Sequence, residues 1–205
     1  MSKAIIPLLC LVMFLSCAKP TDPESLYNAG GYSVVGRLAL AGYGEDVKVR
    51  DTIAYVAQGE GNLTIVSIAD RANPRVLSSY HERLRGAASK VALKDSILYC
   101  VEGTSGVDIV NVADPYAAYW CGHFGGSGTT SHDVEVFGQW MFHGLGGVGW
   151  QVIDFSYSPI VPDPQSTIEG PGFSMGMAMT ADSSLLIACG EMGFAAYDLR
   201  DTTPS

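Results

Sequence analysis

An internal repeat of about 44 residues limits the fold of this sequence more than any other feature. Residues 46–70 and 90–114 align without a gap. Identical pairs recur at an offset of 44 residues: Asp51/Asp95, Tyr55/Tyr99, Gly59/Gly103, Ile65/Ile109 and Asp70/Asp114. Two more divergent copies follow at offsets of 43 and 44 residues, over residues 133–156 and 176–201. A fixed period of this length is typical of architectures built from one stacked supersecondary unit.

Each copy contains three β-strand signals. The first is short and alternates apolar with polar residues, as in 46–50, and the second is apolar and aromatic, as in 53–57. A glycine-rich turn separates the second signal from the third, as in 63–68, and a fourth strand signal lies between copies, as in 75–80. Alternation with a period of two, bounded by Gly, Asp and Pro, is the pattern of a half-buried strand.

Four short strands in about 43 residues form the blade of a β-propeller. Helical solenoids are excluded because the 3.6-residue periodicity of their helices is missing. The sequence therefore predicts an all-β propeller of four blades, each with four strands. Ile65, Ile109, Val152 and Ala196 take equivalent positions in the four copies, and we expect all four to be buried.

The segment 32–40 permits two arrangements of these blades. It has the pattern of a fourth strand but precedes the first full copy. If it completes the last blade, the four blades form a closed ring. If it does not, the chain is an arc of a larger propeller with an exposed sheet edge.

The third strand and its ending resemble the LVIVD repeat family. The segments that carry the resemblance are GNLTIVSIADRANP (61–74) and GVDIVNVADP (106–115), with weaker copies at 149–156 and 193–201. The resemblance covers about residues 32–205 and implies a repeat β-propeller, as found in bacterial surface and periplasmic proteins. It implies little about activity, because one fold serves many functions.

The N-terminus has the pattern of a targeting segment. Lys3 precedes an apolar run from Ala4 to Leu15, which is short for a bilayer span. Phe14-Leu15-Ser16-Cys17 resembles the lipobox of bacterial lipoproteins. That resemblance implies a signal peptide at 1–16, a lipid on Cys17, and a tether at 17–31. An ordinary secretory signal cut near Ala18 is the alternative.

Ala18 also indicates where such a lipoprotein is located. The resemblance implies that an Asp at this position would retain the protein in the inner membrane, and Ala18 is not an Asp. We therefore expect a lipid-anchored protein of the bacterial envelope, at the outer membrane, on its periplasmic or surface side.

Charge and cysteine content exclude several classes of function and of binding site. With 12 Lys+Arg against 21 Asp+Glu, the formal net charge is −9, which excludes a basic nucleic-acid binder. Behind Cys17 the cysteines are odd in number and form no CxxC motif, so neither a zinc site nor a disulfide framework is indicated. We predict no metal and no cofactor.

Candidate ligand contacts lie at the starts of the innermost strands. Asp46, Lys90 and the adjacent His132 and Asp133 hold matching places in successive copies. A propeller brings matching positions together around its axis, and binding pockets form where loops converge. We expect these four residues to approach one another at the channel mouth, where the alternative role is that of spaced, solvated charges.

Two functions of different class remain open. The first is a binding or scaffolding module for a protein or a small-molecule partner, and the second is a propeller enzyme (hydrolase, lyase or oxidase) with a site in the central channel. An enzyme needs several positioned titratable groups. The sequence offers few and no catalytic motif, so it favours the binding module without deciding the question.

Overall fold

The computed structural model describes residues 33–60, 62–81, 85–160, 163–170 and 172–199. The chain divides into two compact units, Met1–Val35 and Gly36–Ser205, and every described strand belongs to the second. The expected signal peptide (1–16), Cys17 and the tether (17–31) lie outside the described residues. Within the described part the helical segments are two three-residue 3₁₀ turns, and none is long and apolar enough to cross a membrane.

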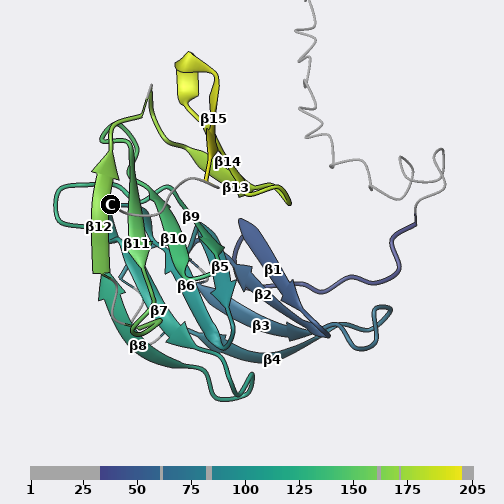
Figure 1. Cartoon of the computed structure of the whole chain (residues 1–205). Coiled ribbons are helices and arrows are strands. Elements are labelled where there is room, and N and C mark those ends of the chain that lie inside the picture. Colours follow the sequence, from purple (N-terminus) through teal and green to yellow (C-terminus); the bar gives the residue numbers. More distant parts are fainter. Residues whose placement is uncertain (1–32, 61, 82–84, 161–162, 171, 200–205) are drawn as a thin grey trace, which may run out of the picture. The chain divides into compact units, whose positions relative to one another are not determined.

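The strands form four antiparallel sheets, one for each repeat (Figure 1). Blade 1 contains β1 (Asp46–Arg50), β2 (Ile53–Ala57), β3 (Leu63–Ser67) and β4 (Arg75–Tyr80). Blade 2 contains β5 (Lys90–Lys94), β6 (Ile97–Val101), β7 (Val107–Asn111) and β8 (Tyr119–Phe124). Blade 3 contains β9 (Asp133–Phe137), β10 (Trp140–Gly144), β11 (Trp150–Asp154) and β12 (Asp163–Ile168). Blade 4 contains β13 (Gly176–Met179), β14 (Ser184–Ala188) and β15 (Phe194–Asp198).

The repeated turn residues are explained by the inner hairpins. Asp51, Asp95 and Gly138 each follow an inner strand with a positive φ, between 52° and 59°. Two-residue hairpin loops require a left-handed backbone, which Asp, Asn and Gly tolerate best. Asp51 and Asp95 therefore recur at the same place in the two copies because each inner hairpin needs a left-handed residue there.

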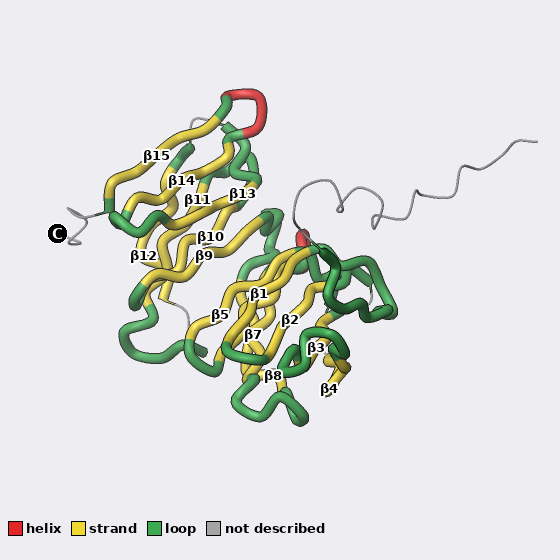
Figure 2. Tube along the Cα trace, turned by 90° about the vertical axis from the view of Figure 1, so that its right-hand side faces the viewer, coloured by secondary structure: helices red, strands yellow, loops and turns green. Residues whose placement is uncertain are grey.

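Successive blades pack face to face through three apolar cores. The innermost strands β1, β5, β9 and β13 lie next to one another in that order (Figures 1 and 2). One core joins blades 1 and 2, a second joins blades 2 and 3, and a third joins blades 3 and 4. Side chains at the far ends of the inner strands add links, because Arg50 donates to the carbonyl of Asp95 and Lys94 to that of Gly138. The predicted four-blade all-β propeller is confirmed.

Blade 4 differs from the prediction at its outer edge. It has three strands within the described residues, and 33–40 contains no strand. Gly36 instead lies against the turn after β3, where an added Cβ would be 2.0 Å from the carbonyl oxygen of Arg71. The pairing of this segment with the last blade, one of the two arrangements that the sequence permits, is therefore not formed in the described residues.

One expected core position is also corrected. Ile65 and Ile109 are fully buried and Val152 is half-buried, but Ala196 is exposed. The repeat equivalence holds, since Ala196 pairs with Leu186 as Ile109 pairs with Tyr99. Ala196 is exposed because its side of the sheet faces no following blade among the described residues.

Candidate functional site

The predicted axial residues start the inner strands, and two of them connect neighbouring blades. The Asp46 carboxylate accepts a hydrogen bond from the backbone N–H of Val91, at 3.0 Å. Two repeats further on, in blade 3, Asp133 accepts one from the N–H of Met177, at 2.7 Å. Lys90 holds the equivalent place in blade 2. Both carboxylates thus join their own blade to the inner strand of the next one.

Three of the four axial residues share one electrostatic environment. Burial raises the pKa of Asp133, and the nearby negative charge of Asp46 raises it further. Hydrogen bonds from the backbone of Met177 and Val134 and the positive charge of Lys90 act in the opposite direction. His132 is turned elsewhere, with its ring edge-on to Phe173 at 5.3 Å between centroids. The structure thus brings Asp46, Lys90 and Asp133 together, with the His132 ring beside Phe173. Their role as ligand contacts stays a prediction.

An ion pair that the sequence analysis did not identify spans the inner strands. Lys48 of β1 and Glu135 of β9 lie 3.5 Å apart, so the pair links blade 1 to blade 3. A cavity of about 350 Å³ adjoins it, lined among others by Arg50, Leu93 and Asp95. The repeat gives no signal for this pair, because the position equivalent to Lys48 in blade 2 is Ala92.

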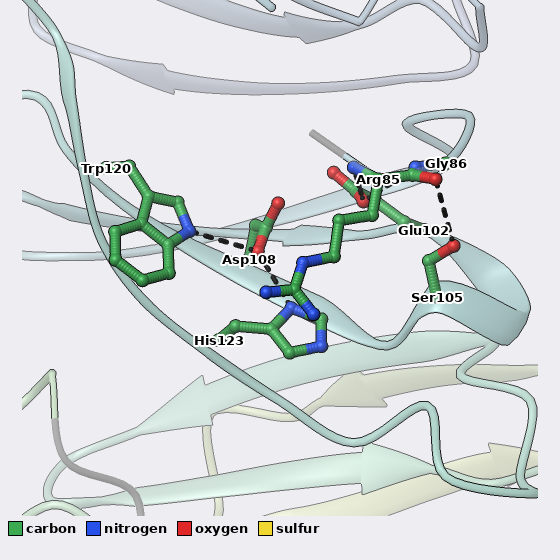
Figure 3. A network of polar contacts seen from close by, with 7 residues as sticks. All are labelled: Arg85, Gly86, Glu102, Ser105, Asp108, Trp120 and His123. Atoms are coloured by element: carbon green, nitrogen blue, oxygen red, sulfur yellow. Dashed lines mark hydrogen bonds and ion pairs between the residues drawn. The ribbon is translucent and has the colours of Figure 1, made fainter. Parts of the chain in front are cut away.

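The most deeply buried acidic groups form a second site, in blade 2 near its junction with blade 1 (Figure 3). Glu102 follows β6 and is 3% exposed, and Asp108 lies on β7 and is fully buried. Glu102 accepts hydrogen bonds from the backbone N–H groups of Arg85 and Gly86, at 2.7 and 2.9 Å. Asp108 accepts from the Trp120 indole at 3.2 Å and from the His123 ring at 2.8 Å. We call Glu102 and Asp108 the carboxyl pair.

Burial lowers the acidity of Glu102, one member of the carboxyl pair. Desolvation and the neighbouring Asp108 raise the pKa of Glu102 to about 7. One oxygen of each carboxyl has no hydrogen-bond partner outside the pair among the described residues. Glu102 therefore keeps its proton to a higher pH than an exposed glutamate does, because burial and a like charge beside it both disfavour its ionised form.

The equivalent positions in blade 1 explain what the carboxyl pair does structurally. Glu102, Asp108 and His123 correspond at an offset of 44 to Gln58, Thr64 and Ser79. Gln58 accepts from the N–H of Gly42 at 3.1 Å and donates to Thr64, whose hydroxyl lies 3.2 Å from that of Ser79. In both blades this network holds the segment that leads into the blade. Blade 1 uses neutral groups for it, and blade 2 uses titratable ones.

Replacing Glu102 with glutamine, the residue of blade 1, is expected to change how stability depends on pH. The folded pKa of about 7 lies above the ordinary value of 4.5, so the wild type loses stability as pH rises through this range, and the loss is complete above it. Chemical denaturation between about pH 5 and pH 8 should show the Glu102→Gln variant gaining relative to wild type as pH rises.

His143 adds a second pH dependence, which the comparison of the two proteins removes. Burial lowers its pKa from 6.5 to about 4, so its contribution to stability is lost as pH falls. This slope has the opposite sign and is present in both proteins, so it cancels in the difference. Parallel pH profiles for the two proteins would contradict the assignment to Glu102.

A hollow of about 650 Å³ opens where the leading segment meets blade 1. Its lining residues, which define what we call the linker hollow, are Ala41, Gly42, Tyr43, Glu45, Gln58, Gly59, Glu60 and Ala87. Tyr43 is 87% exposed, and both glutamates are exposed at the rim. The buried Gln58 fixes the wall through its bond to Gly42. The sequence analysis missed this hollow, because it forms only when 41–45 folds against 58–60.

Within the described residues no group of three or more His, Cys, Asp or Glu side chains is placed to hold a metal ion. The free thiols of Cys100 and Cys189 are buried, and Cys121 is half-buried. Burial raises the pKa of the Cys100 thiol, which keeps it protonated and unreactive.

Comparison with protein families finds a match to a repeat family. Residues 41–82 match the LVIVD repeat. The matched segment is blade 1 with its leading segment, including Gly42, Gln58 and Thr64 of the neutral network. Together with four repeated sheets, the match supports the repeat β-propeller family. Comparison with curated proteins finds no significant match.

Two solved structures with similar folds are computationally designed proteins. The Ika4 protein aligns with a TM-score of 0.63 and 8% identity, over 82% of this chain and 98% of Ika4. The Ika8 protein aligns with a TM-score of 0.57 and 9% identity, over 78% of this chain. The chain spans about half of Ika8, 48% of its length. At these identities the likeness concerns the fold alone.

Proposed function

We propose that this protein is a lipid-anchored binding or scaffolding module of the bacterial envelope, and that its partner is a protein or small molecule that places a cationic group in the linker hollow. The hollow carries this proposal. Its volume of about 650 Å³ lies within the range of ligand pockets. The rim glutamates, Glu45 and Glu60, favour a positive group, and the exposed Tyr43 ring offers a face to a cation.

The positions of the other acidic groups favour binding over catalysis. Asp46 and Asp133 accept interblade hydrogen bonds at the axis, and the carboxyl pair is closed off in the interior. A general acid or base must come within hydrogen-bond reach of its substrate. The enzyme alternative, with a site in the central channel, would need one of these groups to be released from its structural bonds.

Binding is tested with N-acetylarginine amide and its neutral counterpart N-acetylcitrulline amide. We expect the arginine compound to shift the NMR signals of the linker hollow, and the citrulline compound to leave them unchanged. Glu60→Gln and Tyr43→Ala should each weaken the arginine effect, while Tyr157→Ala, a change at another exposed tyrosine, should not. Equal shifts with both compounds would reject a cationic ligand.

The proposed anchor rests on the sequence around Cys17. An apolar run followed by Ser16 and Cys17 supports lipid attachment, and Ala18 supports the outer membrane as destination. Acyl chains contribute about 0.8 kcal/mol for each buried CH₂, so multiple chains hold a protein at a membrane.

Cys17→Ala is expected to abolish both metabolic labelling with a palmitate analogue and membrane association of the full chain. Cys10→Ala is the matched control, since Cys10 lies inside the apolar run and should be irrelevant to labelling. Undiminished labelling of Cys17→Ala would reject the anchor while leaving the binding proposal untouched.

A further inference from the structure

Each inner strand presents two apolar side chains to the blade before it. Those of blades 2, 3 and 4 pack into the interblade cores and are Val91 and Leu93, Val134 and Val136, and Met177 and Met179. Their counterparts in blade 1 are Val47 and Val49, which are 51% and 56% exposed. Blade 1 therefore carries an interface face that no blade covers.

The opposite face of blade 4 is uncovered in the same way. Leu63, Val107 and Trp150 begin the third strands of blades 1, 2 and 3, and each is buried in the core shared with the following blade. The equivalent residue of blade 4 is Phe194, which is 71% exposed. Ala196 and Leu186 lie on the same side of the sheet.

These two faces are complementary because they repeat the two halves of an interface that the fold already forms three times. At each existing junction the third strand of one blade shares a core with the inner strand of the next, as Leu63 does with Val91. The corresponding pair at the uncovered faces is Phe194 with Val47. Apolar surface of this kind is the usual mark of an interaction site.

We propose that the uncovered face of blade 4 binds the uncovered face of blade 1 in a second copy of this chain. Within the described residues β1 and β13 do not pack together as the other inner strands do. The three cores and the Lys48–Glu135 ion pair hold the blades of one chain in their present arrangement. A second copy covers both faces without disturbing them.

The same geometry defines the assembly. The contact joins two different faces, so it is head-to-tail, and two such contacts close a pair of chains. Blade 4 starts with Gly176 where blades 1 and 3 have Asp46 and Asp133, so the new junction lacks the carboxylate that bonds to the next inner strand. We therefore expect it to be weaker than the two junctions that Asp46 and Asp133 bridge, and, because it joins separate chains, to depend on protein concentration.

Thiol crosslinking with a bis-maleimide reagent tests the proposal with the full chain in detergent. A reagent is needed because facing sheets lie about 10 Å apart, whereas a disulfide requires Cα atoms within about 7 Å of each other. All variants carry Cys121→Ser, which removes the half-buried thiol among the described cysteines. When Val47→Cys and Phe194→Cys chains are mixed with the reagent, we expect a crosslink between two chains. Leu63→Cys/Val91→Cys, whose positions share an existing core, should crosslink within one chain and serves as the positive control.

Sedimentation of the Cys121→Ser protein measures the association without crosslinking. We expect a two-chain species at micromolar concentration, with the dissociation constant raised about tenfold or more by Phe194→Asp and left unchanged by Tyr157→Asp. Circular dichroism checks that both variants are folded. A single-chain species at all concentrations would overturn the proposal. A Val47→Cys/Phe194→Cys variant that bridges only within one chain would also overturn it, in favour of a ring closed by a single chain.

Discussion

Replacing Ile109 with alanine is expected to lower the free energy of unfolding by about 2–5 kcal/mol. Ile109 is fully buried in the core between blades 2 and 3, together with Tyr99, Val134 and Ile153. The substitution leaves a cavity between two sheets that are held in place by strand pairing on both sides, so the site cannot collapse fully. Chemical denaturation monitored by circular dichroism measures the loss.

Val76→Ala is the matched control for that experiment. It removes a β-branched apolar side chain from a strand, β4, but Val76 is 46% exposed. We expect a loss below about 1 kcal/mol, since little apolar surface returns to water. A loss of similar size for Ile109→Ala would mean that the third strand of blade 2 does not face a packed neighbour.

Gly149→Ala is expected to be the most damaging single change to a turn. Gly149 precedes β11 with a φ of 108°, and an added Cβ would lie 2.2 Å from the carbonyl oxygen of Ile168 on β12. The left-handed backbone alone costs about 1–2 kcal/mol for a residue with a side chain. The contact with the outer strand adds to this, so we expect a total loss above about 3 kcal/mol.

Gly193 is the equivalent glycine of blade 4 and isolates the two contributions. Its φ of 83° is also left-handed, but no atom of the described residues lies within 4 Å of the position of an added Cβ. Gly193→Ala should therefore cost only the backbone strain, about 1–2 kcal/mol. Thermal and chemical denaturation of both variants provide the comparison. Equal losses would show that the outer strand does not make the turn of blade 3 more sensitive.

The sequence by itself determined the blade. Strand alternation and turn chemistry act over a few residues, so the period of 43–44 residues and the turn positions at Asp51 and Asp95 could be read directly. The same register placed Asp46, Lys90 and Asp133 at the starts of inner strands, where the structure has them. Copies of one unit must repeat one local structure, so these predictions held.

The tertiary structure decided which copies of a position are covered. Ile109 and Ala196 are equivalent in register, yet one is buried and the other exposed, because only Ile109 has a following blade against it. Burial depends on neighbours that lie far along the chain, and no local pattern records whether such a neighbour is present.

For the polar sites, too, the sequence determined which residues are equivalent, and the tertiary structure decided their surroundings. The repeat relates Gln58 to Glu102, but only the folded chain shows that Glu102 and Asp108 are enclosed together, which raises the pKa of Glu102. Only the folded chain shows that Lys48 reaches Glu135 two blades away. A residue's type sets the charge that it can carry. Its surroundings set the cost of that charge, because desolvation and the nearest opposite or like charge depend on segments that only folding brings together.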